Sequence, residues 1–164
     1  MFQRTDLVHG AIALAAGVLF CIAPWHLVIE RVLRLADDPK EIPPPQGVDQ
    51  HHWQLTMTVP NRGGAWMLGL LERLVTLVAL TVDAPVIIVA WLAFKVASKW
   101  EVWGNVIQVS RKLEGTDEIS FLSARRRWGA IMYMRFLLGT LLNLIIGMAA
   151  FGLTWSILVL WSAT

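Results

Sequence analysis

Residues 70–100 read LLERLVTLVALTVDAPVIIVAWLAFKVASKW, two apolar runs separated by the tripeptide DAP at 83–85. An acidic residue followed shortly by proline between apolar runs is typical of a tight turn. The stretch therefore predicts two antiparallel helices. Both helices also carry ionisable groups, Glu72 and Arg73 before the turn and Lys95 after it, and these groups need partners if the helices lie in lipid.

The composition of the whole chain is that of a membrane protein. Its 164 residues are 56% hydrophobic and only 16% charged, whereas soluble domains carry about 25% charged residues. The net charge of +2 is more simply explained by basic cytoplasmic loops than by nucleic-acid binding, so we expect no nucleic-acid partner. The single cysteine cannot form an intrachain disulfide.

We predict an all-α, polytopic membrane protein, with one transmembrane domain over residues 1–164. A membrane-crossing helix needs about 20 largely apolar residues. The predicted spans are residues 7–29, 65–82, 85–100 and 136–161, and the two long loops are residues 30–64 and 101–135.

The ends of the first and fourth spans have further sequence signals. Helical character is predicted to continue from the first span through Leu35, until the prolines at 43–45 end it. Arg4 followed by an apolar core also resembles a signal peptide, but the apolar run is long for one, so we predict a retained helix with a cleaved signal as the alternative. Residues 123–135 are predicted to prolong the fourth helix.

The distribution of basic residues predicts the orientation, because Lys and Arg gather on the cytoplasmic side of membrane proteins. The two long loops and their borders hold Arg31, Arg34, Lys40, Arg62, Lys99, Arg111, Lys112, Arg125, Arg126 and Arg127. The opposite side has Arg4 alone. We therefore predict that both long loops are cytoplasmic, and that the N-terminus, the 83–85 turn and the C-terminus lie outside. The arginines at 125–127 would anchor this topology and contact anionic lipid headgroups.

Counting from the turn suggests partners for the charged residues. Glu72 lies eleven residues before Asp83 and Lys95 twelve after it, so both are roughly 17 Å from the turn at 1.5 Å per residue. Antiparallel neighbours would bring them to the same depth, where Glu72 can pair with Lys95. Arg73 points about 100° away on its helix, and Arg135 lies at a similar depth before the fourth span. We predict a cluster of these four charged residues in the membrane.

Small and weakly polar residues form a stripe on each of two helices. Gly69 and Thr76 share one face with Glu72, while Gly139, Asn143 and Gly147 recur at intervals of four residues. Such stripes permit close helix contacts and interhelical hydrogen bonds in membranes. We predict that they pack against helices of this chain, of a second copy or of a partner protein.

The second half of the chain contains a series of motifs with a known likeness. It has GLLERL at 69–74, AFK at 93–95 and GTLL at 139–142. This order resembles an uncharacterised family of small bacterial integral membrane proteins, whose pattern is G-x-LER-x-L, a turn, A-x-K and E-Y-x-L-x-GTLLS. The likeness covers about residues 64–149. Arg135 and Phe136 replace the E-Y pair of the family, and Asn143 replaces the serine of its GTLLS segment.

The resemblance implies an architecture and a bacterial inner-membrane location, but no mechanism, because the family has no defined function. It adds no catalytic residue, cofactor or metal to those that the residues themselves suggest.

Motifs for common chemistries are absent from the sequence. It has no Gly-rich phosphate loop, no C-x-x-C pair and no H-E-x-x-H helix. His51 and His52 beside Asp49 are a weak metal pattern, since adjacent histidines in an extended segment point in opposite directions. A haem held by two histidines would need ligands on facing helices, whereas His9 and His26 lie on the same span. We therefore predict no cofactor and no metal.

Three functions remain as hypotheses. The favoured one is a non-catalytic accessory or scaffold subunit that acts through helix and loop contacts, with membrane lipids and a protein partner or a second copy as its partners. The second is a small transporter or channel component that uses Glu72 and Lys95. The third is a lipid-modifying enzyme at the cytoplasmic face, with Glu72, Asp49, His51 and His52 as its site.

Overall fold

The structure is a computed structural model of the chain and describes residues 4–35, 63–105 and 118–163. The secondary structure in these ranges is helical, as the predicted all-α class requires. The helices are α1 (Arg4–Ile22), α2 (Trp25–Leu33), α4 (Gly63–Thr81), α5 (Val86–Asn105) and α6 (Glu118–Ser162).

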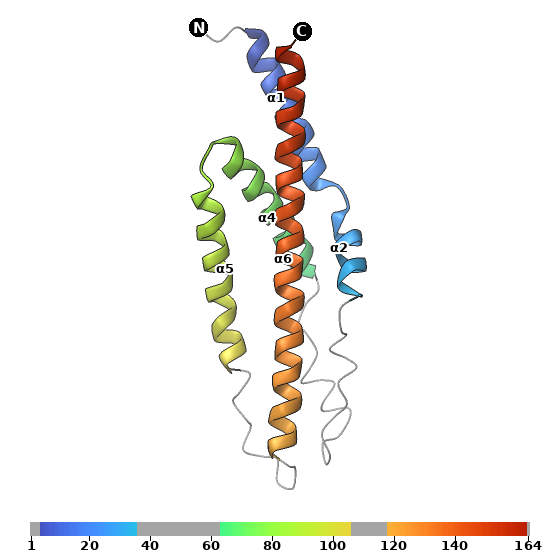
Figure 1. Cartoon of the computed structure of the whole chain (residues 1–164), viewed down its shortest axis with the longest axis vertical. Coiled ribbons are helices and arrows are strands. Elements are labelled where there is room, and N and C mark those ends of the chain that lie inside the picture. The colour runs from blue at the N-terminus through green and yellow to red at the C-terminus, as the bar shows by residue number, and fades with distance from the viewer. Residues whose placement is uncertain (1–3, 36–62, 106–117, 164) are drawn as a thin grey trace.

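Helix α6 is the axis of the molecule. It has 45 residues and is therefore about 67 Å long at 1.5 Å per residue. The predicted fourth span and its extension over residues 123–135 belong to this one continuous helix, which confirms the predicted extension. The most extensive contacts in the fold are those of α6 with α4 and with α1. The three helices form the centre of the bundle, with α5 on one side of α6 and α2 on the other (Figure 1).

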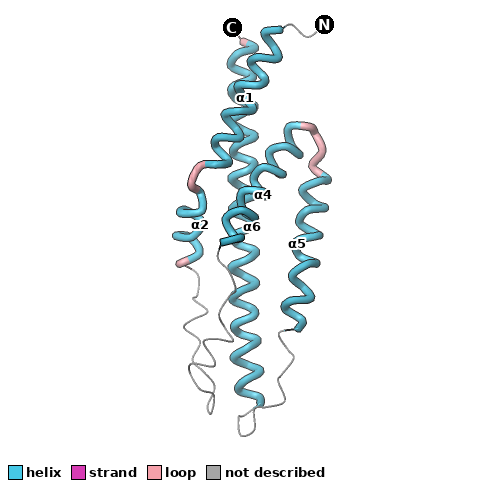
Figure 2. Tube along the Cα trace, turned by 180° about the vertical axis from the view of Figure 1, so that it is seen from behind, coloured by secondary structure: helices cyan, strands magenta, loops and turns pink. Residues whose placement is uncertain are grey.

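The first predicted helix is broken, so the prediction of one continuous helix through Leu35 is wrong. Helix α1 ends at Ile22, and α2 begins at Trp25 at an angle of 41° to it. Proline has no backbone N–H, and its ring clashes with the carbonyl one turn earlier. Pro24 therefore interrupts the helix in the middle of an apolar sequence. The two segments and the bend between them are visible from behind in Figure 2.

The predicted turn at 83–85 is confirmed. Asp83 has a φ of 55°, the left-handed conformation that often ends a helix and that Asp tolerates better than most residues. The amide of Ala84 donates to the carbonyl of Ala79 at 2.8 Å, and the amide of Asp83 donates to the carbonyl of Leu80 at 3.2 Å. These are the two bonds of a Schellman motif. Pro85 then directs the chain into α5, because its fixed φ suits a helix start.

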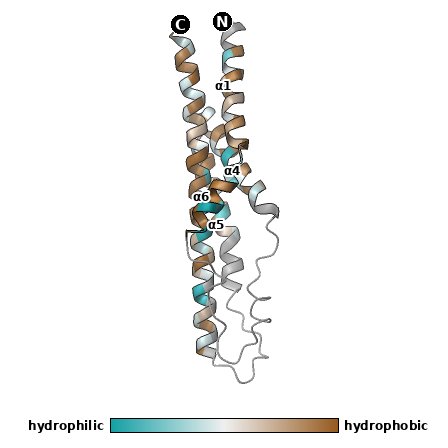
Figure 3. Cartoon of the chain, turned by 90° about the vertical axis from the view of Figure 1, so that its right-hand side faces the viewer, coloured by the Kyte–Doolittle hydropathy of each residue, from teal (hydrophilic) through white to brown (hydrophobic). Residues whose placement is uncertain are grey.

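The distribution of side chains is inverted relative to a soluble bundle. Buried side chains include Glu72, Arg73, Thr76, Lys95, Thr140, Asn143 and Thr154. Large apolar side chains on all five helices are exposed, such as Leu19 at 68%, Val89 at 65% and Leu160 at 68%. The apolar colour covers much of α1 and of the C-terminal half of α6, while polar residues gather where α4 and α5 meet α6 (Figure 3).

One described helical segment, Leu122–Ser162 within α6, is long and apolar enough to cross a membrane. The bent pair of α1 and α2 also qualifies if both belong to a single span, and the apolar part of α5, Val86–Ser98, is shorter. The fold thus contains one or two candidate spans by length and composition. The four predicted crossings remain a prediction.

Candidate functional site

The ion pair predicted between Glu72 and Lys95 is present. Lys95 Nζ on α5 donates to Glu72 Oε1 on α4, and both side chains are buried, with 1% of Glu72 and 7% of Lys95 exposed. The nearly equal distance of the two residues from the 83–85 turn, which the sequence indicates, brings them to the same depth.

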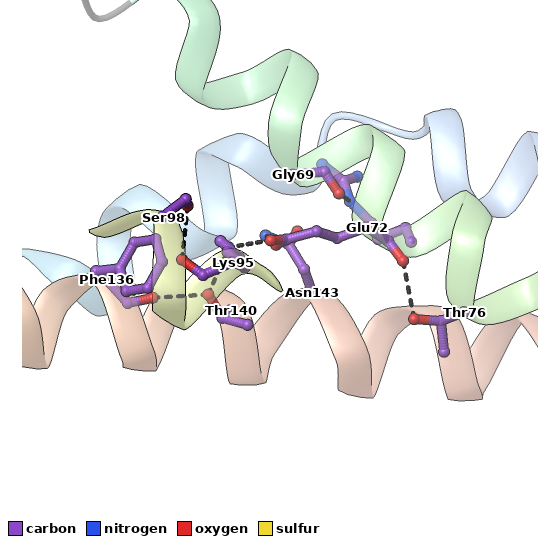
Figure 4. Close-up of polar contacts among 9 residues, drawn as sticks. Gly69, Glu72, Thr76, Lys95, Ser98, Phe136, Thr140 and Asn143 are labelled. Carbon is purple, nitrogen blue, oxygen red and sulfur yellow. Dashed lines mark hydrogen bonds and ion pairs between the residues drawn. The ribbon is translucent and has the colours of Figure 1, made fainter. Parts of the chain in front are cut away.

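Helix α6 completes the surroundings of this pair. Lys95 Nζ also donates to Thr140 Oγ1 at 2.5 Å and lies 4.5 Å from the centre of the Phe136 ring. Asn143 Nδ2 donates to the second carboxylate oxygen of Glu72 at 3.1 Å. We call Glu72, Lys95, Thr140 and Asn143 the polar cluster; it joins α4, α5 and α6 at one level (Figure 4). Charge-assisted hydrogen bonds of this kind are stronger than neutral ones.

Two glycines allow α4 and α6 to approach closely at the cluster. A Cβ atom at Gly69 would lie 2.9 Å from Asn143 Nδ2, so only glycine leaves room for this amide. A Cβ atom at Gly147 would lie 2.6 Å from Thr76 Cβ and 3.0 Å from the carbonyl oxygen of Arg73. Gly69, Thr76, Asn143 and Gly147 therefore pack within one chain, as one of the alternatives from the sequence predicts.

Gly139 does not share this role among the described residues of this chain, so its packing against a second copy or a partner protein stays a prediction. A Cβ atom there would have no other atom of this chain within 4 Å. Of the predicted stripe at intervals of four, Asn143 and Gly147 face α4, and Gly139 does not. The buried face of α6 instead follows Thr140, Asn143, Gly147, Ala150 and Thr154.

Arg73 is buried close to the cluster but is directed to another part of the fold. Its guanidinium donates to the carbonyl oxygens of Gly69, Cys21 and Ala23. It therefore connects α4 to the bend between α1 and α2. Arg135 is half-buried on α6, five residues before Thr140. The Glu72 and Lys95 pair is joined by the neutral side chains of Thr140 and Asn143, and the place of Arg135 in the cluster stays a prediction.

Other predicted site residues lie away from the cluster or outside the described residues. Arg126 and Arg127 are exposed near the start of α6, where the backbone of Arg125 is also helical. Asp49, His51 and His52 lie outside the described residues. Within the described ranges, no group of three or more His, Cys, Asp or Glu side chains is placed to hold a metal ion.

The sequence reasoning missed the part of the core formed by α1. Ala13, Gly17 and Cys21 are buried at intervals of four residues. A Cβ atom at Gly17 would collide with Thr154 Oγ1 and approach the carbonyl oxygen of Ala150 to 3.3 Å. This spacing of small residues was visible in the sequence and is the signal that predicts a close contact. Thr140 stands in the GTLL motif, but no signal in the sequence places it beside Lys95.

The geometry of the cluster favours cohesion over chemistry. Both oxygens of the Glu72 carboxylate accept hydrogen bonds from side chains of other helices. The hydroxyls of Thr76 and Thr140 donate to backbone carbonyls one turn earlier in their own helices, those of Glu72 and Phe136 respectively. A buried charge that is paired and hydrogen-bonded in this way holds helices together, because separating them would leave each charge without a partner.

We compared the chain with family models, curated proteins and solved structures, and none of them matches it. The resemblance to a family of small bacterial membrane proteins therefore remains a prediction from motifs.

Proposed function

We propose that this protein is an integral membrane protein that serves as a non-catalytic accessory or scaffold subunit, acting through contacts of its helices and loops. The observation that carries the proposal is the inverted distribution of side chains, with Glu72, Arg73 and Lys95 inside and large apolar side chains outside. In water this arrangement would expose apolar surface while burying charges. In lipid the exposure of apolar side chains costs no free energy, and the buried polar groups form the contacts between helices.

The proposed membrane arrangement has four crossings and both long loops in the cytoplasm. The helical hairpin of α4 and α5 and the broken helix of α1 and α2 would cross together with α6. The N-terminal part of α6, about residues 118–135, would extend from the membrane at the cytoplasmic side. There the exposed Arg126 and Arg127 would contact anionic lipid headgroups. Together with the motif likeness, this supports a bacterial inner-membrane location.

The role of a scaffold is supported by the use of the buried polar groups. Each member of the polar cluster bonds to a side chain on a helix other than its own, so these groups serve the assembly of the bundle. The exposed apolar faces of α5 and α6 are then the surfaces offered to lipid and to a partner protein or a second copy.

Native purification tests this function. The tagged protein would be extracted from native membranes in a mild detergent, and its companions identified by mass spectrometry against a tagged, unrelated membrane protein of similar size. We expect a stoichiometric companion, or a homo-oligomer on size-exclusion chromatography. Recovery only as a monomer without companions would contradict the scaffold function.

A transporter or channel component is the second candidate, and one observation favours it. Asn143 is 7% exposed, and its Oδ1 is a buried acceptor without a hydrogen-bond donor among the described residues. Ionisable residues inside membranes often mark ion pathways, and this free acceptor belongs to the amide that bonds to Glu72. Flux of protons or alkali cations into liposomes that contain the purified protein, lost in Asn143→Leu, would support this function over the scaffold.

A further inference from the structure

The bend between α1 and α2 leaves backbone carbonyls without their usual helical partners. Pro24 has no N–H to donate to the carbonyl of Phe20, and the amide of Trp25 donates to Ala23 at 2.6 Å instead of to Cys21. A carbonyl that stays unpaired in an apolar interior destabilises the fold, because it loses its hydrogen bonds to water. Each of these oxygens must therefore be satisfied by another donor.

The backbone amide of Ala23 donates a longer bond to the carbonyl oxygen of Phe20, at 3.3 Å, and side chains supply the closer donors. The indole Nε1 of Trp25 donates to the carbonyl oxygen of Phe20 at 2.6 Å, and the Phe20 and Trp25 rings lie 4.9 Å apart. The guanidinium of Arg73 donates through Nη1 to the carbonyl oxygens of Cys21, at 2.8 Å, and of Ala23, at 3.4 Å. Its Nε donates to Gly69 at 3.0 Å. Arg73 is thus held by backbone oxygens from two helices.

The site is built for a positive charge. The Arg73 side chain is 3% exposed, and its hydrogen bonds within the described chain all go to carbonyl oxygens. The C-terminal end of a helix carries partial negative charge, and α1 ends at this point. Carbonyls at the unwound part of a broken membrane helix are the groups that bind cations in many transporters.

We propose that the break between α1 and α2 is a cation-binding site that the chain fills with its own Arg73. The tethered guanidinium fixes the bend and ties α1 to α4. When the Arg73 side chain is removed, the site takes a free planar cation of the same chemistry, guanidinium. This inference concerns the joint between helices and does not depend on the scaffold function.

Chemical rescue tests the binding site. Arg73→Ala is purified in detergent, and its melting temperature is measured with increasing guanidinium chloride at low millimolar concentration. We expect a lower melting temperature than in the parent, and a recovery that rises with guanidinium, because a ligand that binds the folded state stabilises it. Urea, a neutral molecule of the same shape, and sodium chloride at equal ionic strength should not restore it. Arg126→Ala, at an exposed arginine, is the matched control.

A double-mutant cycle with Pro24 tests the same site without an added ligand. Pro24→Ala returns an N–H to the backbone, so that α1 can continue and satisfy its own carbonyls. The loss of melting temperature caused by Arg73→Ala should then be smaller in the Pro24→Ala background, which is a positive coupling between the two residues. If Arg73→Ala does not fold alone, recovery of folded protein in the double variant gives the same information.

Three outcomes would overturn the proposal. One is an Arg73→Ala protein that is as stable as the parent, since an empty cation site would then have no cost. Another is an Arg73→Ala protein that guanidinium chloride stabilises no more than sodium chloride does. The third is a Pro24 cycle without coupling, in which the losses of melting temperature are strictly additive or the double variant is as unfolded as Arg73→Ala.

Discussion

At the scale of single residues, the buried and exposed ion pairs of this chain provide a direct comparison. Glu72 pairs with Lys95 in the interior, while Glu30 pairs with Arg34 at 3.0 Å on the surface of α2, with side chains 53% and 73% exposed. Removing one partner of a buried pair costs roughly 3–5 kcal/mol, whereas an exposed pair contributes about 0–1 kcal/mol. We expect Glu72→Gln to lower the melting temperature in detergent strongly and Glu30→Gln to leave it almost unchanged.

The charge swap refines this prediction. The variant with Glu72→Lys and Lys95→Glu should recover part of the loss, because an opposite pair is restored. Recovery should be incomplete, since Asn143 Nδ2 donates to the original carboxylate and a lysine at that position needs an acceptor instead. A Glu72→Gln protein as stable as the parent would refute a structural role for the cluster and strengthen the transporter hypothesis.

The two glycines of α6 give a second prediction at this scale. A Cβ atom at Gly147 meets Thr76 Cβ at 2.6 Å and a backbone oxygen of Arg73 at 3.0 Å, whereas at Gly139 it meets open space. Gly147→Ala should therefore lower the free energy of unfolding by about 1–3 kcal/mol through overpacking. Gly139→Ala should be neutral or stabilising by up to about 1 kcal/mol through helix propensity. Thermal denaturation of both variants in one detergent makes the comparison, and equal losses would contradict it.

At the scale of helices, Lys95 forms polar links from α5 to both α4 and α6. Among its described side chains, from Val86 to Ser98, Lys95 alone is buried, and α5 packs chiefly against α4. Lys95 is also its hydrogen-bonded connection to α6, through Thr140. We therefore expect Lys95→Met to let α5 move away from α6.

Spin labels measure this movement. Cysteines at the exposed positions Val89 on α5 and Met148 on α6, introduced after Cys21→Ala, report the distance between the helices by pulsed electron paramagnetic resonance. The distance distribution should broaden or lengthen in Lys95→Met and stay unchanged in Ser98→Ala, whose hydroxyl, among the described residues, bonds to its own helix. An unchanged distribution in Lys95→Met would show that apolar packing holds α5.

Local sequence signals predicted several helices and the main ion pair, since these depend on features close together in the chain. The 83–85 turn fixed the hairpin of α4 and α5, and counting from Asp83 placed Glu72 opposite Lys95.

The bend at Pro24 was missed because Pro24 lies within an apolar run, and hydropathy does not register a lost backbone donor. The partner of Arg73 was not predictable in this way, since it lies on α1, whose position follows from the packing of the whole bundle. Gly139 and Gly147 look equivalent in sequence, but α4 contacts α6 only at the second.

At the scale of the whole molecule, the fold gives the predicted topology a simple test. The start of α1 and the end of α6 lie at the same end of the bundle, and the turn between α4 and α5 points toward that end (Figure 1). The opposite end holds the beginning of α6, where Arg126 and Arg127 are exposed. If basic residues stay in the cytoplasm, the end with the start of α1 and the end of α6 must lie outside.

Cysteine labelling in whole cells decides the orientation. Single cysteines would be placed at Ser123 and at Ala163, both exposed and near opposite ends of α6, in the Cys21→Ala background. A membrane-impermeant thiol reagent should label the cysteine at 163 in intact cells, and the cysteine at 123 only after the cells are opened. The reverse pattern would invert the topology, and labelling of both positions in intact cells would show that α6 does not cross the membrane. Because α6 contacts α1 and α4 directly, its orientation also sets the direction of the other helices, so this one experiment tests the placement of the entire bundle.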